Sequence, residues 1–131
     1  MVTAQYAFVL TCLFLILTTR VIVRRRGKQV AFGMGNDRLL ERRIRIHGNF
    51  AEYVPLCLLL MALAELQSAP VWSLHVGGAM LVFGRIVHAL SVGREPEFGA
   101  GRVVGMTGTL AALLFCALIA AFPAFVRGFG V

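Results

Sequence analysis

The chain has 131 residues, a formal net charge of +7 and a sequence pI near 10.7. Its hydrophobic content of 59% and mean hydropathy of +0.82 lie far above the roughly 45–50% apolar usage of soluble domains, which argues against a soluble fold. Eight of the thirteen basic residues fall in one connection, over residues 24–45, so the charge fits a membrane topology signal better than a nucleic-acid surface. We therefore predict a single membrane domain over residues 1–131.

Four apolar segments are long enough to cross a bilayer as helices, which takes about 20 residues each. The predicted helices cover residues 4–23, 37–66, 71–90 and 102–125, and the fold class is an all-α integral membrane protein with a four-transmembrane-helix bundle. The first segment is expected to be retained, because its basic residues follow the apolar run instead of preceding it. By the positive-inside rule the connection after it is cytoplasmic, so both termini are expected outside.

The connections carry their own signals. Asn36 or Asp37 is expected to cap the second helix, and the glycine-rich, charged segment 93–101 is expected to be a flexible cytoplasmic connection. In the fourth helix, small residues recur at four-residue spacing, as in Gly105 and Thr109, which allows close contact with another helix. These signals place the helix ends and one helix interface.

The remaining polar and sulfur-containing residues give weaker signals. The three cysteines lie in different predicted helices without CxxC spacing, so we expect them to pack as small apolar residues. The three histidines lack the spacing of a metal site, and none is expected. Glu65, near the outer end of the second helix, is expected to be a solvated end residue.

A polar stripe crosses the second predicted helix. At 100° per residue, five side chains share one face: Arg38, Arg42, Arg45, Asn49 and Glu52. Glu52 lies about one turn inside the apolar run, where an ionised carboxylate costs at least about 2–3 kcal/mol unless it is paired or hydrated. Arg85 of the third helix lies at the same depth, with His88 on its face, so we predict an ion pair between Glu52 and Arg85.

Two interpretations of this ion pair are open. It could only lock two helices together. Alternatively, it belongs to a cationic cavity open to the cytoplasm, with Arg45, Asn49, His88 and Arg102 around it. Such a cavity would suit a small anionic or zwitterionic molecule.

The residues of the stripe resemble a family pattern. RIRIHGNFAEYVPL, residues 43–56, is similar to the arginine-x-x-x-asparagine-x-x-glutamate-x-x-proline pattern of the MAPEG family, the membrane-associated proteins in eicosanoid and glutathione metabolism. GRIVHAL, residues 84–90, resembles the glycine-arginine-x-x-histidine run of the prostaglandin E synthase branch, and GRVVGMTGT, residues 101–109, adds support in the fourth helix. The resemblance covers nearly the whole chain.

The resemblance implies a bundle of four helices per subunit, a homotrimer, and active sites between subunits near the cytoplasmic side of a bacterial inner membrane. It implies glutathione as co-substrate and the catalytic residue Arg102, which stands where the family has a basic residue beside the glutathione sulfur. The residues implied to bind glutathione are Arg45, Asn49, Glu52, Arg85 and His88, with Arg20 or Arg24 reaching a glutathione carboxylate from the neighbouring subunit.

A transferase or peroxidase acting on hydrophobic electrophiles from the bilayer is the leading hypothesis. A thiol with a pKa of about 8.5 is mostly protonated at neutral pH, and a cation beside the sulfur stabilises the reactive thiolate. An arginine acts here by electrostatics, because its pKa is too high for a base.

Departures from the family pattern leave a second hypothesis open. Val103 replaces a serine of the prostaglandin E synthases, Val92 and Met106 replace tyrosines, and Gly48 replaces an arginine found in some members. These changes argue against an eicosanoid-specific synthase and favour, as the alternative, a non-catalytic lipid-binding or scaffold protein of the same fold. A small multidrug exporter is disfavoured, since the first predicted helix has no acidic residue.

Overall fold

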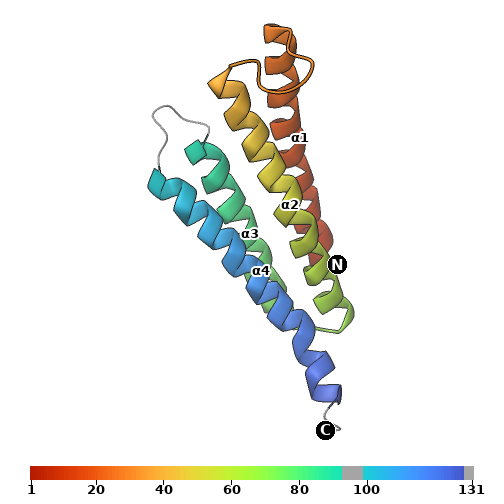
Figure 1. The fold of residues 1–131 in the computed structure, drawn as a ribbon. Coiled ribbons are helices and arrows are strands. Elements are labelled where there is room, and N and C mark those ends of the chain that lie inside the picture. Colours follow the sequence, from red (N-terminus) through yellow and green to blue (C-terminus); the bar gives the residue numbers. More distant parts are fainter. Residues whose placement is uncertain (93–98, 129–131) are drawn as a thin grey trace.

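The structure is a computed structural model, and it describes residues 1–92 and 99–128. Its four helices are α1 (Val2–Lys28), α2 (Arg38–Leu66), α3 (Val71–Val92) and α4 (Gly99–Gly128). Each is long and apolar enough to cross a membrane, which confirms the predicted all-α membrane fold. Successive helices run in opposite directions, so the N-terminus and the α2–α3 turn lie at one end and the α1–α2 connection lies at the other (Figure 1).

The ends of the helices differ from the prediction where basic or glycine residues continue a helix. α1 runs five residues beyond residue 23, to Lys28, and the next residue, Gln29, caps it with a left-handed backbone whose N–H donates to the carbonyls of Arg25 and Arg26. α4 begins at Gly99, so the last three residues of the predicted connection 93–101 are helical. Residues 93–98 of that connection lie outside the described part of the chain.

The start of α2 is as predicted. Asp37 is the N-cap, and its carboxylate accepts hydrogen bonds from the backbone N–H groups of Leu39 (3.0 Å) and Leu40 (3.2 Å). These are two of the donors that the first turn of a helix leaves without partners. The cap therefore fixes where the polar stripe of α2 begins.

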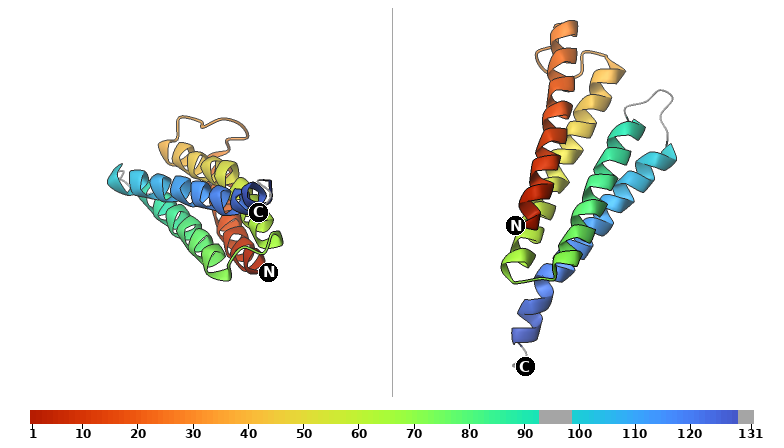
Figure 2. Two further views of the ribbon diagram at one scale, coloured as in Figure 1. Left: turned by 90° about the horizontal axis from the view of Figure 1, so that it is seen from below. Right: turned by 180° about the vertical axis from the view of Figure 1, so that it is seen from behind.

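The four helices form two antiparallel pairs, α1 with α2 and α3 with α4 (Figures 1 and 2). α2 and α3 hold the pairs together, since α1 packs on both of them and α4 packs on both of them. Apolar side chains from all four helices fill the interior, among them Leu10, Phe50, Leu81 and Ala112. Toward the end with the α1–α2 connection the pairs diverge, as both figures show.

Glycines allow α3 and α4 to approach closely. A Cβ atom on Gly105 would lie 2.5 Å from the backbone nitrogen of His88, and one on Gly84 would lie 2.8 Å from Oγ1 of Thr109. Both distances are shorter than side chains tolerate, so these positions accept only glycine without displacement of a helix. The small residues predicted to form a close contact in the fourth helix do so with α3 of the same chain.

Glu65 ties the beginning of α1 to the end of α2. Its carboxylate accepts hydrogen bonds from the backbone N–H groups of Val2 and Thr3, the latter at 3.0 Å, and it lies 4.0 Å from the N-terminal ammonium. The expectation of a solvated end residue was wrong, because the start of α1 offers unpaired N–H donors and a positive dipole end. The Glu65 carboxylate accepts hydrogen bonds from these donors and places a negative charge at the positive end of the helix dipole.

Candidate functional site

A polar cavity of about 670 Å³ lies where the helix pairs diverge. It is lined from α2 by Arg38, Glu41, Arg42, Arg45, Gly48, Asn49 and Glu52, from α3 by His88 and Val92, and from α4 by Arg102. All five residues of the predicted stripe line it, because residues three or four positions apart on a helix share one face. The cavity is thus the place where α2, α3 and α4 present polar side chains to one another.

The cavity brings together most of the predicted site residues. Arg45, Asn49, Glu52, His88 and Arg102 all line it. Val92, where related proteins have a tyrosine by the resemblance, also faces the cavity. The three helices contribute to one cavity because α3 ends and α4 begins at the same end of the bundle as the start of α2 (Figure 1).

Arg85 is buried behind the cavity, with 1% of its surface exposed. Its Nε donates to Oγ1 of Thr109 at 2.8 Å, and its Nη1 donates to Oδ1 and to the backbone oxygen of Asn49 at 3.2 and 3.4 Å. The guanidinium also lies 5.9 Å from the centre of the Tyr53 ring, within range of a cation–π contact. Neutral groups from α2 and α4 therefore surround this cation.

The predicted ion pair between Glu52 and Arg85 is absent from the described structure. Asn49, about one turn before Glu52, accepts hydrogen bonds from the guanidinium instead. Glu52 is exposed and lines the cavity. A buried charge is stable only when its donors find acceptors, and an amide and a hydroxyl meet this need here. Arg85 consequently orients Asn49 from behind, while the carboxylate of Glu52 is left to the cavity.

Glu41 was missed by the sequence prediction. Its Oε1 lies 3.3 Å from Nη2 of Arg45, one helical turn further along α2. The signal was present in the sequence, because glutamate four residues before arginine is the favoured order for a helical ion pair. Exposed pairs of this type contribute about 0.3–0.5 kcal/mol, so a ligand anion can compete for Arg45 at little cost.

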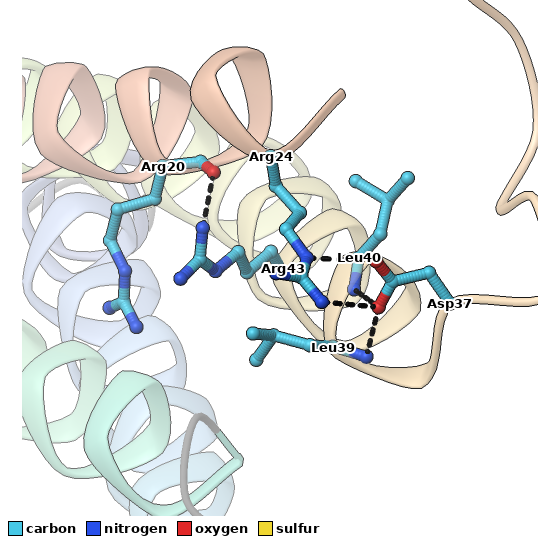
Figure 3. Close-up of polar contacts among 6 residues, drawn as sticks. All are labelled: Arg20, Arg24, Asp37, Leu39, Leu40 and Arg43. Atoms are coloured by element: carbon cyan, nitrogen blue, oxygen red, sulfur yellow. Dashed lines mark hydrogen bonds and ion pairs between the residues drawn. The ribbon is translucent and has the colours of Figure 1, made fainter. Parts of the chain in front are cut away.

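Arg24 is bound within its own chain. Figure 3 shows its guanidinium on Asp37, with Nε 2.8 Å from Oδ2 and Nη2 3.2 Å from Oδ1. Hydrogen bonding from Arg24 holds the pKa of the Asp37 carboxyl below its ordinary value, with help from the N–H groups of Leu40 and Leu39 and against the opposing effect of desolvation. The cap of α2 is thus joined to the end of α1.

Arg20 lies close to this pair, one turn earlier in α1. Its backbone oxygen accepts a hydrogen bond of 2.8 Å from Nη1 of Arg43 (Figure 3). The residues that line the cavity of the single chain do not include Arg20 or Arg24. Their predicted role from a neighbouring subunit stays a prediction.

The cavity has the charge pattern of a site for small anions. Four arginines and two glutamates line it, with His88 buried at its inner wall. Guanidinium groups recognise carboxylates through paired hydrogen bonds, and a carboxylate recognises an ammonium group. A zwitterion with more than one carboxylate matches this set.

The amino-acid sequence matches the family model described as MAPEG family over residues 3–122. It is 36% identical over 118 residues to the inner membrane protein YecN of Escherichia coli strain K12 and to YecN of E. coli O6:H1, covering 90% of this chain and 88% of each relative. No solved structure shows significant similarity to the chain. The family match covers most of each of the four helices and every residue that lines the cavity. The chain belongs to the MAPEG family.

Proposed function

We propose that the protein is a glutathione-dependent transferase or peroxidase of the bacterial inner membrane, acting on hydrophobic electrophiles. One observation carries the proposal: Arg45, Asn49 and Glu52 of α2 and Arg102 of α4 line one polar cavity at the end of a membrane-spanning bundle. The localisation follows the name of the E. coli relative, an inner membrane protein. The positive-inside rule puts the cavity near the cytoplasmic face and both termini outside.

Glutathione carries an α-amino group, two carboxylates and a thiol, and the cavity offers a counterpart to each charged group. The Glu52 carboxylate suits the ammonium, and the arginines suit the carboxylates. Asn49, held in place by Arg85, offers an oriented amide for a hydrogen bond to the peptide backbone of the ligand. His88 closes the inner wall beside it.

In the proposed reaction, the glutathione thiol loses its proton to water, and Arg102 stabilises the thiolate that forms. The thiolate sulfur forms a bond to the electrophilic carbon, and the electrons of the bond that breaks leave with the leaving group. The guanidinium lowers the free energy of the anionic sulfur and takes no proton. The hydrophobic substrate reaches the sulfur from the bilayer, since the helices present apolar side chains outward.

A homotrimer would add a cation from the first helix of the neighbouring subunit. Asp37 engages Arg24, which favours Arg20 for this contact. The Arg20 guanidinium extends from α1 beside Arg43 (Figure 3). Chemical cross-linking in detergent would give the number of subunits.

Titration calorimetry of glutathione into the purified protein tests the binding site, with Glu52→Gln and Arg45→Gln as variants. We expect binding to the native protein and a loss of about 10-fold or more for each variant, equivalent to about 1.4 kcal/mol or more. A matched control is Arg26→Gln, which removes a cation from the same end of the bundle outside the cavity. No binding to the native protein would leave the non-catalytic lipid-binding or scaffold protein as the better hypothesis.

Conjugation of a chromogenic electrophile tests the catalytic role. Arg102→Leu should abolish turnover while glutathione still binds, because the cation acts on the thiolate more than on the ground-state thiol. Arg26→Leu should leave turnover unchanged. Equal turnover by Arg102→Leu and the native protein would remove Arg102 from the mechanism.

A further inference from the structure

The connection between α1 and α2, residues 29–37, is folded against the end of α1. Nη1 of Arg25 donates to the backbone oxygens of Ala31 (3.3 Å) and Gly33 (3.0 Å), and the N–H of Val30 donates to the oxygen of Arg25 (3.0 Å). Gly35 adopts a left-handed backbone and lies directly over the Val30 side chain. The connection therefore has a defined shape that an arginine of α1 holds in place.

This shape presents apolar side chains outward. Phe32 is 93% exposed and Met34 is 48% exposed. Keeping a large apolar side chain in water forgoes about 1.5–3 kcal/mol relative to burial, so an ordered loop that displays two of them indicates a surface that another phase or molecule covers.

The loop lies beside the part of α1 that follows its apolar run. The apolar run of α1 ends at Val23, and the following residues are basic. Figures 1 and 2 show the connection beside the last turns of α1, below the tip of that helix. The connection that carries Phe32 and Met34 is therefore expected at the depth of the lipid headgroups, where amphipathic elements insert apolar side chains.

A groove of about 360 Å³ is lined by both the loop and the last turns of α1. Its lining changes from apolar to cationic: Ile22 lies on the membrane side, Val30 and Ala31 on the loop, and Arg25 and Arg26 toward the helix end. A phospholipid has the same order, with acyl chains below a phosphate. Guanidinium groups are strong phosphate ligands.

The end of α1 beside the groove is basic and attracts anions. Residues 1–36 contain no acidic residue, and the first one, Asp37, is engaged by Arg24. Arg25, Arg26 and Lys28 therefore have no carboxylate within their own segment. Each cation near the membrane surface strengthens the association with anionic headgroups by about a factor of five, and salt reduces this effect.

We propose that the groove between α1 and residues 29–37 binds the headgroup phosphate of an anionic phospholipid, with Phe32 and Met34 inserted among the neighbouring lipids. Arg25 holds the loop and contributes charge to the phosphate, and Arg26 provides a second guanidinium. The site is separate from the polar cavity, and it holds whether or not the protein uses glutathione.

Tryptophan fluorescence in vesicles tests this site, because the chain has a single tryptophan, Trp72, at the opposite end of the bundle. The probe protein is Phe32→Trp with Trp72→Phe. It is placed in phosphatidylcholine vesicles that contain a small, equal fraction of either acyl-brominated phosphatidylglycerol or acyl-brominated phosphatidylcholine. We expect blue-shifted emission and several-fold stronger quenching by the brominated phosphatidylglycerol, with the difference reduced at high salt.

Two controls accompany the measurement. Native Trp72, which is 67% exposed at the far end, should be quenched equally by the two brominated lipids. Arg26→Gln in the probe protein should reduce the preference for phosphatidylglycerol, and it leaves the hydrogen bonds from Arg25 to the loop intact.

Three results would overturn the proposal. Emission typical of water would place Phe32 outside the membrane, and equal quenching by both lipids would remove the preference for anions. Blue-shifted emission without quenching would show that protein, such as a second copy of the chain, covers the loop. Glutathione titration of the probe protein should match the native protein in each case, so a failure here is distinct from a failure of the proposed enzyme activity.

Discussion

Arg85 and Asn49 meet across the α2–α3 interface, with Nη1 of the arginine 3.2 Å from Oδ1 of the asparagine. The guanidinium is 1% exposed, while the asparagine lines the cavity. The amide is thus shared between a buried cation and the cavity, and its orientation is fixed by a residue that does not itself line the cavity. One hydrogen bond therefore serves both the packing of α2 on α3 and the lining of the cavity.

Replacing Asn49 separates the two roles. Asn49→Ala removes an acceptor from a buried guanidinium and should destabilise the protein by about 1–3 kcal/mol, measured by thermal unfolding in detergent. Asn49→Asp keeps an acceptor for Arg85, so its unfolding temperature should stay near that of the native protein. The added negative charge should weaken the binding of anionic ligands. Equal destabilisation by the two variants would contradict the role assigned to this hydrogen bond.

Gly48 offers a gain-of-binding test. It lines the cavity, and a Cβ atom built on it has no neighbour within 4 Å. Gly48→Arg should be tolerated and should stabilise the helix by about 0.5–1 kcal/mol, since glycine is a poor helix former. The extra guanidinium should tighten glutathione binding, more so at low salt. Gly27→Arg is the control, because Gly27 also has open space but lies outside the cavity; tighter binding by that variant would indicate a nonspecific charge effect.

Gly105 tests the close packing of α3 and α4. Gly105→Ala should destabilise the bundle by about 1–3 kcal/mol, because the new methyl group would lie 2.5 Å from the backbone nitrogen of His88. Gly108→Ala, one turn away, meets only an ordinary contact of 3.6 Å to Gly84 and should be neutral or stabilising. Thermal unfolding of the two variants in parallel tests this. An unfolding temperature of Gly105→Ala equal to that of the native protein would show that α3 and α4 can move apart at little energetic cost.

The lowered pKa of Asp37 predicts that part of the protein's stability is lost in acid. Its pKa is lowered in the folded protein, chiefly by the hydrogen bond from Arg24. A carboxyl with a lowered pKa stabilises the fold above its ordinary pKa, and this contribution is lost as the pH falls through the lowered value. Asn also caps helices, so Asp37→Asn should lower the unfolding temperature at neutral pH and match the native protein in strong acid. A gap that persists in acid would assign the effect to something other than the carboxylate charge.

Local sequence features determined the four helices and the face that α2 presents. Apolar runs of sufficient length must become helices in a bilayer, because the backbone has no other partner for its N–H and C=O groups. The spacing of Arg45, Asn49 and Glu52 then places them on one side of the helix whatever surrounds it. The cap at Asp37 likewise depends on only a few neighbouring residues.

Tertiary structure decided which polar groups meet. At the level of sequence, Glu52 and Arg85 were the natural pair, since both are charged and lie at similar depth. In the bundle, the rotation of α2 brings Asn49 to Arg85 and turns Glu52 to the cavity. Glu65 likewise found its partners in the start of α1, more than sixty residues away.

The same distinction holds for the α1–α2 connection. The basic residues that flank it in α1 and α2 predicted only a cytoplasmic location, whereas its fold depends on hydrogen bonds from Arg25 and on where the loop turns back along α1. The period of a helix is an intrinsic property of the backbone, so the sequence alone determined the helices and the polar stripe. Contacts between helices depend on the relative rotation and approach of whole elements, so only the tertiary structure could decide the partner of Arg85, the shape of the cavity and the groove beneath the loop.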